Sequence, residues 1–177
     1  MGPEQELLKH FLAAIAYRTQ KALRGASDAF ADFYAGNHVR TPHELVWHMT
    51  GVLGYAITYF RGGVWQPDKL GSFADEIARF HQVLEELGKA LETKTPLRAI
   101  SAKQLLQGPL ADVMTHAGQL AILRRLAGSP VPSENFIRAR IDTGNLGPSQ
   151  PEPAAPDPGW EPDLPAPAPG KDVPEGW

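Results

Sequence analysis

The sequence predicts an all-α protein, an antiparallel up-down four-helix bundle followed by a proline-rich C-terminal extension. Two observations favour the bundle. Apolar residues recur at intervals of three and four along residues 4–126, and stretches with the two-residue alternation of a half-buried strand are nearly absent. The extension follows from the prolines, because ten of the 17 lie in residues 148–177. Connections between the expected helices are short enough for antiparallel neighbours.

Composition divides the chain into two parts and excludes several kinds of site. We expect one bundle domain over residues 1–147 and an acidic tail, extended or disordered, over residues 148–177. The tail holds six acidic residues and one lysine, whereas the bundle is nearly neutral and has no basic run. Nucleic-acid binding is therefore not expected. The absence of cysteine excludes disulfides, thiolate metal sites and cysteine nucleophiles.

The N-terminal residues bear on localisation. Acidic side chains stand where a signal peptide has Lys or Arg, and no stretch approaches 18 apolar residues. We therefore expect a cytoplasmic protein that does not bind membranes.

Capping signals place the first half of the bundle. A first helix is expected over residues 4–23, with a further helical turn or two over residues 27–35. The second helix begins at Thr41, an N-cap residue followed by Pro42 at the first helical position and Glu44 at the third. It is expected to run to about residue 60.

The third and fourth helices follow two more caps. Ser72 precedes a helix whose apolar positions step by four and three, which predicts a buried seam: Phe73, Ile77, Phe80, Leu84, Leu87 and Leu91. Ser101 begins the fourth helix, and Gly108 and Pro109 are expected to interrupt it before it ends near residue 128.

Three residues of these helices have metal-ligand chemistry. Asp112 and His116 are four residues apart, so they share one helix face and could chelate a divalent ion or form a surface hydrogen-bonded pair. His48 falls within the apolar stripe of the second helix, where it is either a core histidine or a ligand. Together the three would converge inside the bundle, where helical bundles build metal sites. Three ligands with open coordination positions is a catalytic arrangement.

Other polar residues have alternative interpretations. His81, on the flank of the third helix, could be a fourth ligand, an acid–base group or a partly exposed polar residue. Gln119 could support His116 by a hydrogen bond or make a helix contact. Arg124 and Arg125 are expected to offset the dipole at a helix end. Three histidines are expected in solvent: His10, His38 and His43.

Two stretches carry a resemblance to a known family. They are TPHELVWHM at residues 41–49 and DVMTHAGQLAILRRLAG at residues 112–128, and over about residues 4–147 the chain resembles the DinB/YfiT-like metalloenzymes. The resemblance implies a four-helix bundle, a homodimer, and a divalent ion held by a histidine of the second helix and a His-x-x-x-His pair of the fourth. Carried over by position, these ligands are His48, Asp112 and His116.

The sequence departs from the family at Asp112, where the common motif has histidine. Either the site is a two-His one-carboxylate triad, or metal binding at it is weakened or lost. Because a carboxylate is an acceptable ligand, we expect a retained site, with zinc or nickel ahead of manganese or iron.

Two functional hypotheses follow. The chain is a metal-dependent enzyme acting on a small molecule, and by resemblance a thiol-dependent S-transferase or a hydrolase that activates a low-molecular-weight thiol or water. Alternatively, it is a non-catalytic metal- or ligand-binding dimer whose proline-rich tail docks to a partner.

Overall fold

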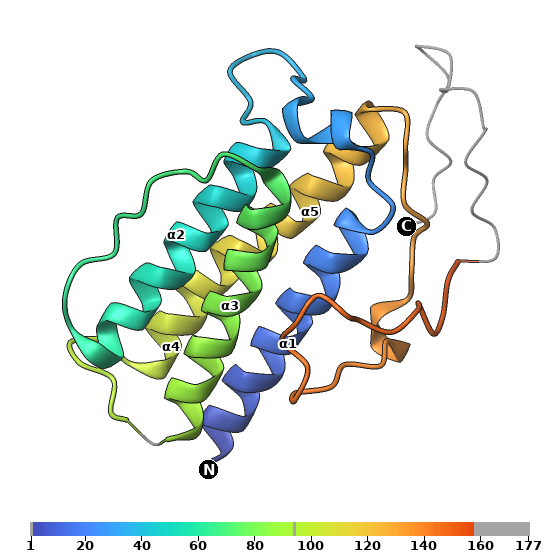
Figure 1. The fold of residues 1–177 in the computed structure, drawn as a ribbon. Coiled ribbons are helices and arrows are strands. Elements are labelled where there is room, and N and C mark those ends of the chain that lie inside the picture. Colours follow the sequence, from blue (N-terminus) through green and yellow to red (C-terminus); the bar gives the residue numbers. More distant parts are fainter. Residues whose placement is uncertain (1, 94, 158–177) are drawn as a thin grey trace.

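The computed structural model describes residues 2–93 and 95–157, and in this part of the chain it is all-helical (Figure 1). The only ladder pairing there is an isolated bridge between Glu134 and Pro156. The prediction of an all-α four-helix protein is confirmed. None of the described helices combines the length and apolar character needed to cross a bilayer. The helices are α1 (Pro3–Leu23), α2 (Pro42–Arg61), α3 (Phe73–Glu92) and, as two pieces of the expected fourth helix, the short α4 (Ala102–Leu105) and α5 (Ala111–Leu126).

The predicted helix boundaries are confirmed where the sequence has capping signals. The side chain of Thr41 accepts from the backbone N–H of Glu44, and the Glu44 carboxylate accepts from the backbone N–H of Thr41, which closes a capping box. Ser101 begins α4 in the same way. The expected interruption is a π-helical segment, Leu106–Leu110, which contains Pro109 and leads directly into α5.

The core lies between α1, α2, α3 and α5. Phe80 and Leu84 of the predicted seam are 0% exposed, and Leu87 and Leu91 are also buried, whereas Phe73 and Ile77 are only partly covered. On α2 the buried face is rotated slightly from the predicted stripe, and it holds Leu45, Val46, Met49, Leu53, Ala56, Ile57 and Phe60. His48 therefore stands at the edge of the buried face.

The predicted alternation of helix directions is wrong for the consecutive pair α2 and α3, which run the same way. The rings of His43 and Phe73, near the starts of the two helices, lie 5.7 Å apart, and Arg61 at the end of α2 pairs with Glu86 of α3 at 3.1 Å. The helix α1 packs between α3 and α5, and α2 packs between the same two helices on the other side (Figure 1).

The connection after α2 explains the parallel pair. Residues 62–72, here called the crossover loop, are 11 residues that lead from the end of α2 to the start of α3. Extended chain of this length spans about 36 Å, and a 20-residue helix is about 30 Å long. The loop can therefore return along the whole of α2, and the expectation of a short antiparallel connection fails.

Specific contacts fix the crossover loop along α2 and α3. The Trp65 ring occupies the space where a side chain at Gly54 would be, and the indole Nε1 of Trp47 donates to the carbonyl of Pro67 at 3.0 Å. The buried Glu76 carboxylate accepts from the backbone N–H of Leu70 at 3.1 Å.

A buried ion pair completes this attachment. Glu76 is 0% exposed and pairs with Arg79 at 2.6 Å, and Arg79 in turn donates to the carbonyl of Asp68 at 3.0 Å. The pair therefore holds two backbone positions of the crossover loop against the start of α3.

Two glycines of α2 provide a matched test of the crossover loop. Gly54→Ala places a methyl group inside the Trp65 ring, so we expect a loss of about 2 kcal/mol in the free energy of unfolding. Gly51→Ala meets no heavy atom within 4 Å and should gain about 0.5–1 kcal/mol from its better helix propensity. Urea denaturation measures both. Equal effects of the two substitutions would mean that Trp65 does not rest on Gly54.

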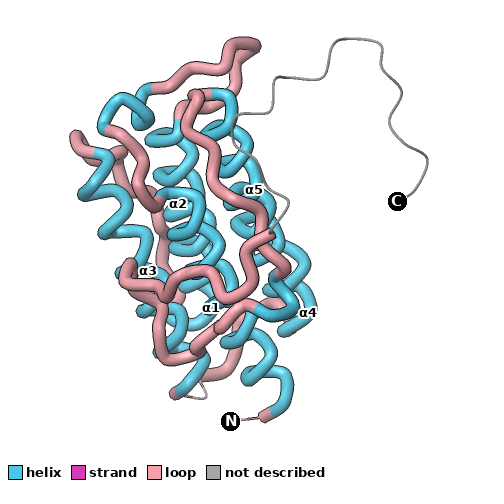
Figure 2. The backbone as a smooth tube through the Cα atoms, turned by 90° about the vertical axis from the view of Figure 1, so that its right-hand side faces the viewer, coloured by secondary structure: helices cyan, strands magenta, loops and turns pink. Residues whose placement is uncertain are grey.

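The segment after α5 returns to pack on α1, as Figure 2 shows. The hydroxyl of the buried Tyr17 donates to the Glu134 carboxylate at 2.8 Å, and Arg24 donates to the carbonyls of Gln150 and Pro151. Residues 148–157 of the expected tail thus follow an irregular path and contact Arg24 at the end of α1. The rest of that tail, 158–177, lies outside the described residues.

Candidate metal centre

His48, Asp112 and His116 come together between α2 and α5, as the sequence predicts. Nε2 of His116 lies 3.3 Å from Oδ1 of Asp112, and Nε2 of His48 lies 3.9 Å from Oδ2 of the same carboxylate. The two imidazole rings meet edge to face with centroids 4.9 Å apart. One candidate ligand atom from each residue lies within 4.8 Å of the other two, so the group could hold a metal ion.

Local structure aims these side chains. Asp112 stands in the first turn of α5, immediately after the π segment, and His116 follows one turn later on the same face. The capping box at Thr41 sets the start of α2, and His48 is then two turns into that helix. The helices α2 and α5 run in opposite directions. Positions near the start of both can therefore meet only if α5 begins partway along the bundle instead of at its end. The α4 and π segments supply that offset.

Gln119 orients His116. Its Oε1 atom lies 2.8 Å from Nδ1 of His116, so of the two alternatives open for Gln119 the structure shows the hydrogen bond. Since an amide oxygen only accepts, the imidazole donates from Nδ1. The lone pair of the neutral ring is then on Nε2, the atom that faces Asp112.

The donor set fits a divalent transition ion. Two imidazole nitrogens and one carboxylate oxygen are ligands that zinc, nickel, manganese and ferrous ions accept. Two ligands on a tetrahedral ion are about 3.4 Å apart at ordinary bond lengths. The 3.3 and 3.9 Å separations from Asp112 to the two histidines run to different oxygens of its carboxylate. One ligand atom from each residue lies within 4.8 Å of the other two, so side-chain rotations would be needed to reach the spacing around an ion.

The surroundings of His48 favour its neutral form. Burial lowers the pKa of this imidazole below its ordinary value, and electrostatic interaction with Arg40 and with His116 acts in the same direction, while Asp112 opposes them. A histidine that is already neutral has no proton to lose on binding a metal.

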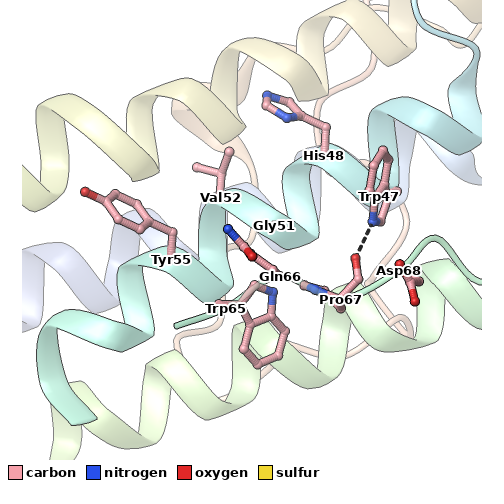
Figure 3. A pocket seen from close by; sticks show the side chains of 9 residues that line it. All are labelled: Trp47, His48, Gly51, Val52, Tyr55, Trp65, Gln66, Pro67 and Asp68. Atoms are coloured by element: carbon pink, nitrogen blue, oxygen red, sulfur yellow. Dashed lines mark hydrogen bonds between the residues drawn. The ribbon is translucent and has the colours of Figure 1, made fainter. Parts of the chain in front are cut away.

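Two hollows meet at the cluster. The first, here called the aromatic groove, is a space of about 590 Å³ between α2 and the crossover loop, with His48 in its wall (Figure 3). The second, of about 540 Å³, is bounded by α2 and the start of α5 and includes Asp112. Val52 and Tyr55 belong to both. The cluster is therefore accessible to small molecules from these two hollows. The aromatic groove is lined by Trp47, His48, Gly51, Val52, Tyr55, Trp65, Gln66, Pro67 and Asp68.

Two histidines differ from their predictions. His81 is not a partly exposed flank residue but is 2% exposed, and its Nδ1 lies 2.8 Å from the carbonyl of Leu146, on the side where the C-terminal segment packs. It does not belong to the cluster. His43 is 6% exposed rather than solvated, because Phe73 of the parallel helix covers it. His10 and His38 are exposed, as predicted.

Sequence reasoning missed the residues around the cluster. Trp47 precedes His48 and lines the aromatic groove with Trp65, and Arg40 acts electrostatically on His48 from before α2. The adjacent Trp47 and His48 were a usable signal, since neighbouring helix positions near a ligand often line its cavity. Trp65 and Arg40 are in loops, whose paths periodicity does not predict.

Comparisons with known proteins identify no relative. No family model matches the chain, and no curated protein or solved structure does so.

Proposed function

We propose that this chain is a divalent-metal-dependent enzyme of the DinB/YfiT-like type that acts on a small molecule, as an S-transferase using a low-molecular-weight thiol or as a hydrolase. The observation that carries the proposal is the convergence of His48, Asp112 and His116 beside two open hollows. The two motifs at residues 41–49 and 112–128 support it. The ion is proposed to be zinc or nickel, with manganese or iron as alternatives.

Each residue has a proposed task. A bound divalent ion would lower the pKa of a thiol or water and so generate a nucleophile at neutral pH. His48 and His116 would bind through Nε2, and Asp112 would supply one oxygen and offset part of the positive charge. Gln119 would keep His116 in the required tautomer.

The open surroundings favour an enzyme over the non-catalytic alternative. A purely structural site is closed by protein ligands, whereas a catalytic site keeps a position for substrate. In the described residues only three side chains with metal-ligand chemistry gather here, and aromatic side chains line the adjoining space. The docking of a partner to the tail, residues 148–177, stays a prediction, and residues 158–177 of that tail lie outside the described part.

A thiol-binding experiment tests the proposed function. The full chain, without a polyhistidine tag, is loaded with cobalt(II) and titrated with dithiothreitol. We expect a thiolate-to-cobalt charge-transfer band, which His116→Ala removes. A chain that binds cobalt but shows no such band would contradict the thiol-dependent reaction and leave hydrolysis as the alternative.

Metal retention is expected to depend on pH. Both imidazoles must be neutral to bind, so protons compete with the ion. Because the pKa of His48 is lowered, competition at this ligand begins at lower pH than at an exposed histidine. Occupancy should hold at neutral pH and fall below about pH 6. Equilibrium dialysis at a series of pH values measures it, and constant occupancy down to about pH 4 would exclude imidazole ligands.

We also propose that the chain forms a homodimer. Exposed apolar side chains surround a hollow of about 620 Å³ on the α2 and α5 side: Val39, Ile122 and Leu126. A second copy would cover them. Light scattering should give twice the chain mass, and a mass near 19.3 kDa at high concentration would count against the dimer.

A further inference from the structure

The aromatic groove differs in chemistry from the other spaces near the cluster. Trp47, Tyr55 and Trp65 supply its ring surfaces, with Val52 and Pro67 adding aliphatic area. Among the described residues that line it, none is Lys or Arg, and the acid Asp68 is the charged group at its rim. Arg40, the cation that acts on His48, lines the separate hollow that also contains Gln119.

Both walls of the groove are held in place. Trp47 and Val52 project from α2, and Trp65 and Pro67 belong to the crossover loop opposite, as Figure 3 shows. The loop wall is tied to α2 by the bond from Trp47 to Pro67, and Trp65 is seated on Gly54. A groove with fixed walls can bind a rigid ring without first ordering its own side chains.

The groove and the cluster are continuous, because His48 is both a candidate ligand and a lining residue. We propose that the aromatic groove binds an uncharged aromatic or alicyclic ring of the substrate, next to the group that reacts at the metal. This rests on the proposed function for the metal and adds the class of substrate. Ring surfaces favour an apolar or aromatic body. An anion such as a phosphate or carboxylate in the groove would meet Asp68, and no Lys or Arg is among the lining residues to pair with it.

Two imidazole probes test this directly. The cobalt-loaded full chain is titrated with imidazole and with 4-phenylimidazole, each followed through the cobalt absorption spectrum. If the phenyl ring enters the groove, 4-phenylimidazole should bind about tenfold tighter or more, because burying a phenyl ring is worth at least that factor. Adding a carboxylate to the phenyl ring should remove the advantage. Equal affinities of imidazole and 4-phenylimidazole would overturn the proposal.

Variants locate the effect. Trp47→Ala should abolish most of the phenyl advantage while imidazole itself binds unchanged. Ile122→Ala removes an exposed apolar side chain from the hollow that contains Arg40 and Gln119, and it should leave the phenyl advantage intact. An advantage that survives Trp47→Ala and also Tyr55→Ala would place the ring outside the groove and contradict the assignment.

The proposals for the groove and for the metal site can be contradicted separately. A chain that binds cobalt but shows no phenyl advantage contradicts the groove alone. A chain that binds no cobalt contradicts the proposed function, and the groove is then tested without metal by the indole N–H resonances of Trp47 and Trp65. These should shift with 4-phenylimidazole and not with imidazole. Unshifted resonances would overturn the groove as well.

Discussion

His116→Ala is expected to abolish metal retention and to lower the affinity for zinc more than about 100-fold. Loss of a residue that only orients a ligand already lowers metal affinity by about 10–100-fold, and His116 is itself a proposed ligand. His116 presents Nε2 to Asp112 at 3.3 Å, and Gln119 fixes its orientation through Nδ1. His48→Ala should have the same effect from the opposite helix. Competition with a chromophoric chelator measures both affinities.

The exposed His10 supplies the control, because His10→Ala removes an imidazole that does not belong to the cluster and should leave zinc affinity unchanged. Asp112 gives a sharper comparison. Asp112→His should keep or strengthen binding, since imidazole is also a good ligand, and Asp112→Ala should weaken it. If Asp112→Ala leaves the metal content untouched, the two-His one-carboxylate assignment is wrong.

Arg124→Ala is expected to lower the free energy of unfolding by about 3 kcal/mol. The Arg124 side chain is 3% exposed and joins the ends of two helices that run the same way. Its guanidinium donates to the carbonyls of Ala22, in the last turn of α1, and of Arg24, directly after it. It also donates to the carbonyl and hydroxyl of Ser129 after α5. Truncation would leave buried carbonyls without donors, which is more costly than losing an exposed ion pair.

The next residue is a natural control. Arg125→Ala removes the same side chain from the exposed face of α5 and should change stability by less than about 0.5 kcal/mol. Urea denaturation compares the two variants. Similar losses would show that the dipole effect expected of both arginines outweighs the hydrogen bonds that only Arg124 makes.

The parts of the fold that local sequence determines could be predicted. Thr41 and Ser101 begin helices because a hydroxyl and an acid or amide three residues later satisfy the free N–H groups there. The pairing of Asp112 with His116 follows from helical spacing alone. His48 could be singled out because it is a histidine at a position within the predicted apolar stripe of the second helix.

Features that depend on the path of a loop could not be predicted. The direction of α3 is set by how residues 62–72 return along α2, and periodicity carries no information on that choice. The burial of His43 follows from the same parallel packing. His81 is covered by Leu146, 65 residues later in the chain, in a segment without regular structure. Such contacts arise from tertiary packing, which no local pattern encodes.

The central claim is that His48, Asp112 and His116 bind one divalent ion, and anomalous diffraction tests it most directly. Crystals of the full chain, grown without a polyhistidine tag and equilibrated with zinc, would be measured on both sides of the zinc absorption edge. We expect one strong anomalous peak per chain between the two Nε2 atoms and the Asp112 carboxylate. A zinc-equilibrated crystal without a peak there, or with its main peak at other residues, would contradict it.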